Sequence, residues 1–588
     1  MDRITKQFLT EFVDQHDLKK LAESTAFEHF CGALLSSSHV GESVDSEDIA
    51  VGAGGDCGID CIAVVANGSL ITEPEEVKDL CDLNGYLDVS FIFVQSETSS
   101  GFDTQKIGQF AFGVRDVLAE TPKLPQNPSV AKYAAITREV YAQSRFFRKG
   151  NPQCFLYYAT TGKWVDDTNL TVRRDGERGD IEALGIFRTV FFECIGADIL
   201  QELYRKAQNA ISCEVVLEKR VVIPKLPGVE QAFIGLLPAT EFLKMIQSST
   251  GEILASLFYD NVRHWQEWNV VNNEIKATLD SPAQKAFFPL LNNGITIVAQ
   301  RVNPTGDRLL IEDYQIVNGC QSSFVLHACR SQLEDGNVMI PVRIIATRDE
   351  EVRNAIIKAT NRQTEVTADQ FFAISEFPKK LETYFATFQG KQRLYYERRA
   401  RQYAQDGTIE RVRVINMTLL VRAFAAMFRE APHRTTRNYK ALLKEVGDEI
   451  FGSSHRLEPY YVAALAHYRL DYLFRNGHVD SKLKPARYHI LLAARYLHIP
   501  AKLPRMNAHE MERYCEAFQK VLWSDEDAKE LLTRAGALIE TLADGDFSRD
   551  TIRTEPFTKK LLQYFSEKPG ANTNNAAASG SGNCDETP

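Results

Sequence analysis

The sequence predicts a multidomain α/β protein in which two mixed α/β domains are followed by a mostly α-helical C-terminal part. Two observations predict this fold class. Apolar runs typical of buried strands alternate with helical periodicity over roughly the first 400 residues, whereas residues 411–565 have mostly helical periodicity. With 588 residues, of which 44% are hydrophobic, the chain is long enough for about three large domains with separate cores.

Residues 1–210 are the first predicted domain. Phe27, Phe30 and Leu34 recur at the spacing of one helix face, which predicts an amphipathic helix. The β-rich apolar runs that follow are bounded by Gly, Asn and Asp, as is typical of buried strands. The predicted elements are a helix at 27–35, strands at 59–65 and 89–94, a polar loop at 98–103, a helix at 104–118 and a strand at 154–159.

Residues 211–405 are the second predicted α/β domain, and residues 406–568 are the helical C-terminal part. Residues 569–588 contain no Leu, Ile, Val or aromatic residue and cannot bury a face, so we expect a disordered tail. The elements predicted in the second domain are strands at 214–223, 294–300, 309–317 and 340–347 and helices at 240–248, 321–333 and 350–359.

The composition excludes several classes of protein. With 68 basic and 78 acidic residues, the net charge of −10 excludes a wholly cationic nucleic-acid binder. The sequence has no apolar window of about 18 residues and no signal peptide at its N-terminus, so we expect a cytoplasmic protein that does not enter the membrane. None of the 11 cysteines lies in a Cys-x-x-Cys pair, which disfavours a zinc site and indicates reduced thiols.

Polar side chains cluster at the predicted strand ends of the first domain. Glu28 lies on the first helix, and Asp60 ends the glycine-rich turn at 54–60. Gln95 and Glu97 end the next strand and share one of its faces. If the two strands pair, these oxygens converge into a site suited to Mg²⁺, a cation that prefers oxygen ligands and activates water. The alternative is that the acids are solvated residues at ordinary strand ends.

Amide side chains recur beside turns in the second domain, within LNNGITIVA (291–299), IVNGCQSS (316–323) and KATNRQT (358–364). Asn-Gly is a strong turn signal, so ordinary turns beside strands are one interpretation. The other interpretation is binding, because amide groups both donate and accept hydrogen bonds and can read a base or a phosphate. The candidate nucleic-acid-binding amides are Asn293, Asn318, Gln321, Asn361 and Gln363.

One stretch of the chain is basic, although the chain as a whole has a negative net charge. Residues 391–440 contain twelve basic and four acidic residues, a local net charge of +8. Arg398, Arg399 and Arg401 alternate with tyrosines that could stack on bases, which is typical of nucleic-acid docking. Arg263 is a weaker candidate of the same kind. A solvated helix face with internal ion pairs is the alternative.

The N-terminal constellation resembles the PD-(D/E)xK restriction-endonuclease-like superfamily: a helix glutamate, the Gly-Gly-x-x-Gly-Ile-Asp turn, and a strand that ends in Gln-Ser-x. The resemblance implies that Glu28 and Asp60 are acids of a metal site and that Gln95 is the first residue of the last motif. The chain departs at the third position of that motif, where Glu97 replaces the lysine. Lys106, on the next helix, is a candidate substitute for the missing lysine.

The middle of the chain resembles the AIPR family, the abortive-infection phage-resistance proteins of bacteria. The resemblance covers roughly residues 230–530. It rests on NNGITI and VNGCQS in this order, together with FYDNVRHW (258–265), VVNNEIKATL (270–279) and LYYERRARQY (394–403). It implies phage defence through damage to nucleic acid, with DNA or RNA as the partner. A homodimer and a phage-derived trigger are further partners that this resemblance leaves open.

Three functional interpretations follow from the sequence. The first is a defence nuclease that uses Mg²⁺, with Glu28, Asp60, Gln95, Glu97 and Lys106 as catalytic residues and Glu28, Asp60 and Glu97 as metal ligands. The second is a nuclease-like domain without activity that serves as a binding or assembly platform, because Glu97 repels a phosphate where lysine would attract it. The third is a sensor of a small molecule or a modified base, built from the amide motifs.

Overall fold

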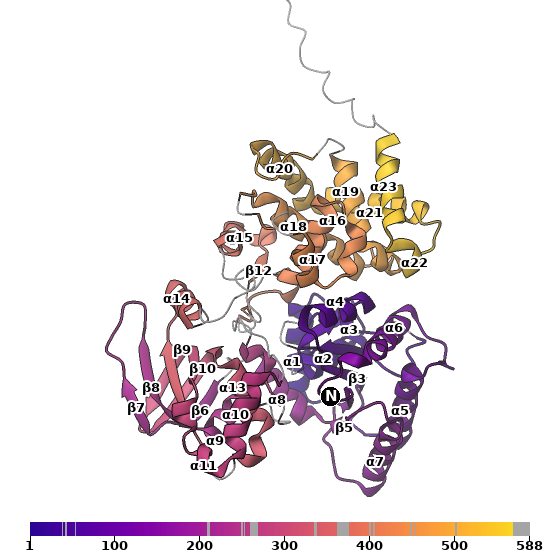
Figure 1. The fold of residues 1–588 in the computed structure, drawn as a ribbon. Helices are drawn as coiled ribbons and strands as arrows, with labels where there is room; N and C mark the ends of the chain where they lie inside the picture. Colours follow the sequence, from indigo (N-terminus) through magenta and orange to yellow (C-terminus); the bar gives the residue numbers. More distant parts are fainter. Residues whose placement is uncertain are drawn as a thin grey trace, which may run out of the picture. The chain divides into compact units, whose positions relative to one another are not determined.

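The computed structural model describes residues 1–567 except 38, 41–43, 53, 209–211, 248–250, 252, 259–267, 334–337, 361–375, 399–401, 404–405, 447–449, 453 and 500–502. The chain forms two compact units (Figure 1). The first unit comprises Met1–Ala386, Tyr395–Met417 and Lys440–Glu445. The second comprises Thr387–Leu394, Thr418–Tyr439 and Val446–Pro588.

The N-terminal part of the first unit is built on a five-stranded sheet in the order β2-β1-β3-β4-β5. Strand β1 pairs antiparallel with β2 and β3, whereas β3, β4 and β5 are parallel. The elements are α1 (Arg3–Gln15), α2 (Glu23–Ser37), α3 (Ser46–Ile49), β1 (Cys61–Ala66), β2 (Ser69–Ile71), α4 (Pro74–Asn84), β3 (Val89–Glu97), α5 (Thr104–Leu118), α6 (Pro128–Ala142), β4 (Gln153–Thr160), α7 (Thr168–Glu182), β5 (Thr189–Ile195) and α8 (Ala197–Gln208).

Helices cover both faces of this sheet. Val64 of β1 belongs to a buried cluster with Phe110 of α5, and the neighbouring Ala63 belongs to another with Phe30 of α2. The first cluster also takes side chains from α4, α6 and α7, and the second takes them from α1 and α8. Because both faces are buried, the strands are continuous apolar runs, such as CIAVVA in β1.

A six-stranded sheet, in the order β6-β10-β9-β11-β8-β7, forms the second part of this unit. Its pairs are antiparallel except for the parallel pair β9 and β11. The elements are β6 (Ser212–Val216), β7 (Lys219–Val222), β8 (Gln231–Pro238), α9 (Ala239–Ile246), α10 (Val270–Asp280), α11 (Pro282–Lys285), α12 (Phe288–Leu291), β9 (Ile295–Thr305), β10 (Arg308–Asn318), α13 (Cys320–Ala328), β11 (Met339–Ala346) and α14 (Glu350–Thr360). The unit also contains α15 (Glu376–Ala386), most of α17 (Tyr439–Val446), and a separate parallel pair of strands, β12 (Tyr395–Glu397) and β13 (Val414–Asn416).

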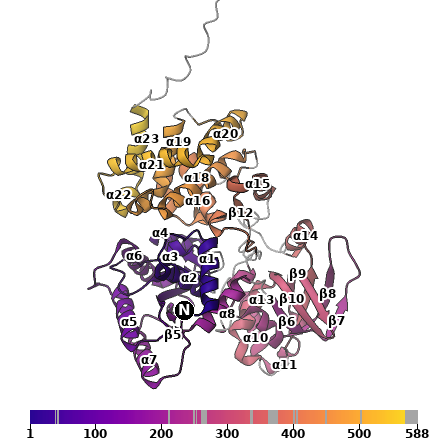
Figure 2. The ribbon, with the colours of Figure 1, turned by 180° about the vertical axis from the view of Figure 1, so that it is seen from behind.

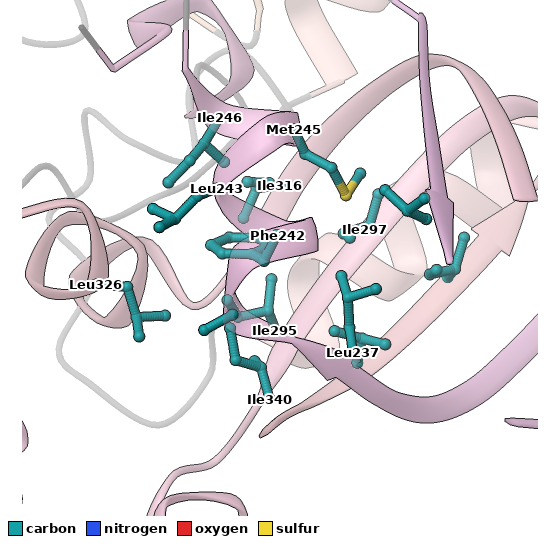
Figure 3. Close-up of a cluster of buried hydrophobic side chains, with 14 of the residues drawn as sticks. Leu237, Phe242, Leu243, Met245, Ile246, Ile295, Ile297, Ile316, Leu326 and Ile340 are labelled. Atoms are coloured by element: carbon teal, nitrogen blue, oxygen red, sulfur yellow. The ribbon is translucent and has the colours of Figure 1, made fainter. Parts of the chain in front are cut away.

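Helices α9 and α13 pack on one face of the six-stranded sheet and form a separate buried cluster with it. Helix α9 contributes Phe242 and Met245, which lie among Ile297 of β9 and Ile316 of β10, while Leu326 comes from α13 (Figure 3). All five side chains are completely buried. The alternation of buried and exposed residues along β10 is the pattern expected for a strand with one buried face.

The structure divides the single strand predicted at 214–223 into β6 and β7. These strands occupy opposite edges of the sheet, yet only Leu217 and Glu218 link them. The sheet therefore curls until its two edges lie close together. The backbone N–H of Leu217 donates to the carbonyl of Asp307, in the turn between β9 and β10, and this contact ends the pairing of β6. The other strands and helices predicted in this part are confirmed to within a few residues, except that the helix predicted at 321–333 ends at Ala328.

The second unit is helical, as predicted for the C-terminal part, and is drawn in orange and yellow in Figure 2. Helix α18 is buried around most of its circumference, which is typical of a central helix. The helices are α16 (Met417–Phe428), α18 (Glu458–Arg475), α19 (Arg487–His498), α20 (His509–Trp523), α21 (Asp525–Leu542), α22 (Arg549–Ile552) and α23 (Glu555–Glu567). The predicted tail, 569–588, lies outside the described residues. Among the helices that the structure describes, none has both the length and the apolar composition to cross a membrane.

Candidate functional site

The glycine-rich turn before β1 positions Asp60. Asp56 accepts hydrogen bonds from the backbone N–H groups of Gly54 and Gly58, at 3.3 and 2.8 Å. Gly54 and Gly58 both have positive φ, of 78° and 73°, a conformation that side chains other than glycine rarely adopt. The turn thereby delivers Asp60 to the start of β1, where its backbone N–H donates to the carbonyl of Val94 on β3.

Asp60 is held by Ser96 at the end of β3. One oxygen of its carboxylate, Oδ2, accepts from the backbone N–H of Ser96 at 2.6 Å and from the Ser96 hydroxyl at 2.9 Å. The side chain is nearly enclosed, since Asp60 is only 8% exposed. The predicted pairing of these strands is confirmed, because Cys61 lies opposite Val94 in the β1–β3 register.

Glu28 of α2 lies in the same acidic neighbourhood. Burial and then the charge of Glu28 raise the pKa of Asp60 to about 7. Burial, followed by the charges of Asp56 and Glu97, raises the pKa of Glu28. Gly52 makes room for this glutamate, because a Cβ there would lie 2.9 Å from Glu28 Oε2. Glu28, Asp60 and Glu97 are therefore near enough for the charge of one carboxylate to raise the pKa of another. Their role as ligands of a cation stays a prediction.

Gln95 precedes Ser96 at the end of β3. Its amide nitrogen is 3.4 Å from the carbonyl of Ser96. Its amide oxygen, Oε1, is buried and accepts no hydrogen bond from the residues that the structure describes. A buried acceptor without a partner costs free energy, and a cation would remove that cost.

Lys106 and Glu97 form an ion pair beside this cluster. Lys106 Nζ lies 2.7 Å from Glu97 Oε1, and their side chains are 49% and 26% exposed. The contact with Glu97 raises the pKa of Lys106, so the amine stays protonated. Asp103 caps α5 by accepting from the backbone N–H of Gln105 at 2.6 Å and that of Lys106 at 3.3 Å, which fixes the first turn of the helix.

The donor atoms of this region suit a hard divalent cation. They are the carboxylates of Glu28 and Asp60 and the amide oxygen of Gln95, which are ligand types that Mg²⁺ prefers. Across the part of the chain that the structure describes, no three His, Cys, Asp or Glu side chains are grouped to hold a metal ion together. An ion here would therefore need an amide or backbone oxygen in addition to carboxylates.

The two Asn-Gly turns of the second domain lie against each other. A Cβ on Gly319 would lie 3.1 Å from the carbonyl oxygen of Gly294, and both glycines have positive φ. Next to them, Asn292 Nδ2 donates to the Ser322 hydroxyl at 2.9 Å. The segments 291–299 and 316–323 thus form one structural unit, which supports the interpretation of these motifs as turns.

The predicted amides differ in exposure and partners. Asn293 is exposed. Asn318 donates to the carbonyl of Thr360 at the end of α14, and Gln321 Oε1 accepts from Asn272 Nδ2 at 2.8 Å. Two of the described amides therefore have partners within the protein. Their role in binding nucleic acid stays a prediction, and Asn361 and Gln363 lie outside the described residues.

Arg398, in the basic stretch, is buried. It is only 4% exposed, and its Nε donates to Glu382 Oε2 at 2.9 Å. The neighbouring Tyr396 is completely buried, with its hydroxyl 3.4 Å from the sulfur of Met417. This geometry agrees with the alternative of internal ion pairs. The predicted candidates Arg263, Arg399 and Arg401 lie outside the described residues.

Several residues of these sites were not predicted. Ser96 holds Asp60, and Asn272, Asn292 and Ser322 complete the amide contacts. Ser96 lies between Gln95 and Glu97, so its place within the strand-end motif was a usable signal. Asn272 carried no such signal, because its contact with Gln321 joins segments 49 residues apart.

One region of the chain matches a known protein family. Residues 258–535 match the family model described as AIPR protein. The match supports the resemblance of the middle of the chain to the AIPR family. A search of curated proteins and a search of solved structures gave no match.

Proposed function

Starting from the AIPR match of residues 258–535, we propose that this chain is an anti-phage protein of the abortive-infection type, whose N-terminal domain cleaves DNA or RNA with a divalent cation. The observation that carries the nuclease part of the proposal is the position of Lys106. Its ammonium group lies 2.7 Å from Glu97, at the strand end where a nuclease of this kind is expected to have a lysine. The cytoplasm is the compartment in which we expect it to act.

Glu28, Asp60 and Gln95 are the proposed ligands of the cation. Mg²⁺ bound there would lower the pKa of a water molecule and supply the nucleophile for attack on a phosphodiester. Glu97 was also predicted as a ligand from the sequence. Because the Glu97 carboxylate is paired with Lys106, Gln95 is the proposed source of the third oxygen. Its Oε1 is buried and accepts no hydrogen bond from a described residue.

Lys106 is proposed to stabilise negative charge on the phosphate. A fixed ammonium group offsets the charge that develops as the bond to phosphorus breaks. Glu97 is a positioning residue in this scheme, because it holds the amine that enters from α5. Ser96 has a similar supporting role, since its two hydrogen bonds orient the carboxylate of Asp60.

Cleavage assays on the full chain test the proposal. Single- and double-stranded DNA and RNA would be incubated with the purified protein in Mg²⁺ or in EDTA. We expect cleavage that needs Mg²⁺ and is lost in Asp60→Asn, which keeps the shape of the side chain but removes its charge. Asp166→Asn is the matched control, because Asp166 is an exposed acid on the same domain. Cleavage undiminished in Asp60→Asn would remove Asp60 from the mechanism.

The second candidate function is a nuclease-like domain that binds or assembles without cleaving. The ion pair also motivates this candidate, because Glu97 neutralises the only charge that Lys106 could offer to a phosphate. The variant Glu97→Lys distinguishes the two. Activity in Glu97→Lys together with none in the parent protein would favour the binding role, whereas activity in the parent protein excludes it.

A further inference from the structure

A groove runs between helices α5 and α7 of the N-terminal domain. The two helices lie side by side in both views of the chain (Figures 1 and 2). The groove has a volume of about 790 Å³, and Gln105, Gln109, Phe112, Asn169 and Arg173 are among the side chains that line it. It begins at the first turn of α5, which also carries Lys106.

The position of Arg173 depends on a glycine of α5. A Cβ on Gly108 would lie only 1.9 Å from Arg173 Nη2, so the guanidinium group lies directly over the backbone of α5. Glu177 holds it there, with its Oε1 at 2.7 Å from Arg173 Nη2, and Arg115 contacts the other oxygen of Glu177 at 2.5 Å. Arg115 also lies 3.4 Å from Asp180, so two carboxylates balance the two arginines. Arg173 is the arginine of this cluster that lines the groove, and 49% of its side chain is exposed.

Phe112 presents an aromatic ring in the same groove. It lies on the face of α5 that also carries Gln105 and Gln109, at the three- and four-residue spacing of a helix. At 49% exposure, Phe112 is one of the more exposed large apolar residues among those described. An aromatic face offers a stacking surface to any nucleobase.

We propose that the α5–α7 groove holds an unpaired nucleic-acid strand next to the candidate active site, with Phe112 stacked on a base and Arg173 bound to a phosphate. The inference rests on the proposed nuclease function and gives its substrate class as single-stranded nucleic acid. Among the described residues that line the groove, Arg173 is the one with a formal charge. Its guanidinium group is half exposed beside Glu177 and is complementary to a phosphate group. From Gln105 to Phe112 the helix rises by about 10 Å, which limits the contact to a short stretch of strand.

The amide and aromatic side chains that line the groove are the reason why we propose an unpaired strand and not a duplex. The amides of Gln105, Gln109 and Asn169 donate and accept hydrogen bonds, as base edges do. In a duplex the base faces are stacked and the pairing edges are occupied, so the ring of Phe112 has no face to contact. In an unpaired strand both are accessible, and stacking depends little on base identity.

Binding measured without cleavage tests the inference. The full chain in EDTA would be titrated into fluorescent 12-residue oligonucleotides, single-stranded DNA, single-stranded RNA and the DNA duplex, with anisotropy as the readout. We expect Phe112→Ala to weaken single-strand binding by about 5- to 150-fold, the range for loss of one stacked base. Arg173→Gln should weaken the same binding and reduce its salt dependence. Duplex binding should change by less than about twofold in either variant.

Two control variants test whether a loss of single-strand binding comes from the aromatic ring of Phe112. Phe287→Ala removes a phenylalanine of similar exposure, 55%, in the second domain, and should leave single-strand binding unchanged. Phe112→Leu keeps an apolar side chain without the ring and should lose most of the affinity that Phe112→Ala loses. Single-strand affinity unchanged in both Phe112→Ala and Arg173→Gln would overturn the proposal, and so would an equal loss of duplex binding.

The groove and the nuclease function can fail separately. Asp60→Asn should retain the single-strand affinity of the parent protein in EDTA while losing cleavage in Mg²⁺. If Asp60→Asn abolishes cleavage but Phe112→Ala binds as the parent does, the active site stands and the groove proposal is wrong. If Phe112→Ala loses binding but no Mg²⁺-dependent cleavage occurs, the groove stands as a binding site and the nuclease function is wrong.

Discussion

Lys106 Nζ lies 2.7 Å from Glu97 Oε1, although the lysine belongs to α5 and the glutamate to the end of β3. The contact places the ammonium group of Lys106 beside the carboxylate of Glu97 at the end of β3. It also connects α5 with β3, the helix and the strand that carry Lys106 and Gln95. The chain passes from β3 through a six-residue loop, 98–103, and returns through the capped first turn of α5.

Removing the charge of Lys106, or moving it to position 97, tests the role of the lysine. Lys106→Met should lower the cleavage rate by about 10²- to 10³-fold, the usual effect of removing one group that stabilises transition-state charge. Lys78→Met, at an exposed position on α4, is the control and should cleave as the parent does. The double variant Lys106→Met/Glu97→Lys moves the amine to the strand end and should recover part of the rate. Full activity in Lys106→Met would contradict the assignment.

Mg²⁺ should stabilise the N-terminal domain through Asp60 and Glu28. At a Mg²⁺ concentration about 100 times the Kd, binding to the folded state alone stabilises it by about 2.7 kcal/mol. Thermal unfolding with and without Mg²⁺ measures the effect. Asp60→Asn should abolish most of the increase in Tm, and Gln95→Leu should reduce it, because the buried oxygen is removed. An equal increase in the parent protein and Asp60→Asn would place the bound ion elsewhere.

The turn that carries Asp60 should depend on a glycine of α5. A Cβ on Gly113 would lie 1.8 Å from the carbonyl oxygen of Cys57, and backbone cannot yield as a flexible side chain can. We expect Gly113→Ala to destabilise the domain by about 1–3 kcal/mol. Gly176→Ala on α7, where nothing lies within 4 Å of the new Cβ, should instead be neutral or stabilising by about 0.4–1 kcal/mol. Equal thermal stability of the two variants would contradict this packing.

The helical unit should lose stability in acid because of a buried histidine. His489 is 2% exposed, and Thr558 Oγ1 lies 3.2 Å from its Nε2 and 3.0 Å from His433 Nδ1. Burial, aided by the nearby charges of His433 and Arg553, lowers the pKa of His489 to about 3.

The direction of the pH effect follows from this lowered pKa. Unfolded histidine has a pKa of about 6.5, so below that pH the unfolded state takes up a proton that the folded state refuses. Full stability is therefore present above pH 6.5 and is lost as the pH falls toward 3, by about 2 kcal/mol at pH 5.

Hydrogen exchange of α19 and α23 at pH 7.5 and pH 5 measures this loss. His489→Gln should show less acid-induced opening than the parent protein, because it removes the titrating group. His509→Gln, which replaces an exposed histidine of α20, should open as the parent does. An acid response unchanged in His489→Gln would assign the effect to other groups.

Local patterns were sufficient for much of the secondary structure. The helix predicted at 104–118 agrees with α5 at both ends, because Asp103 supplies a cap and the apolar spacing is regular. The strand predicted at 214–223 was wrong as one element, because its two halves pair with β10 and β8 at different edges of the sheet. Edge assignment depends on contacts that are distant in sequence, and periodicity carries no information about them.

The sequence by itself determined the element types, the acidic residues Glu28 and Asp60 and the motifs of the AIPR region, because these follow from spacing and residue type. Only the tertiary structure decided the partners of each side chain. Ser96 holds Asp60 across 36 residues, Lys106 meets Glu97, and Arg398 is buried against Glu382. Each of these contacts depends on how strands and helices pack in three dimensions, so burial and pairing decide the charge that a residue can offer to a ligand.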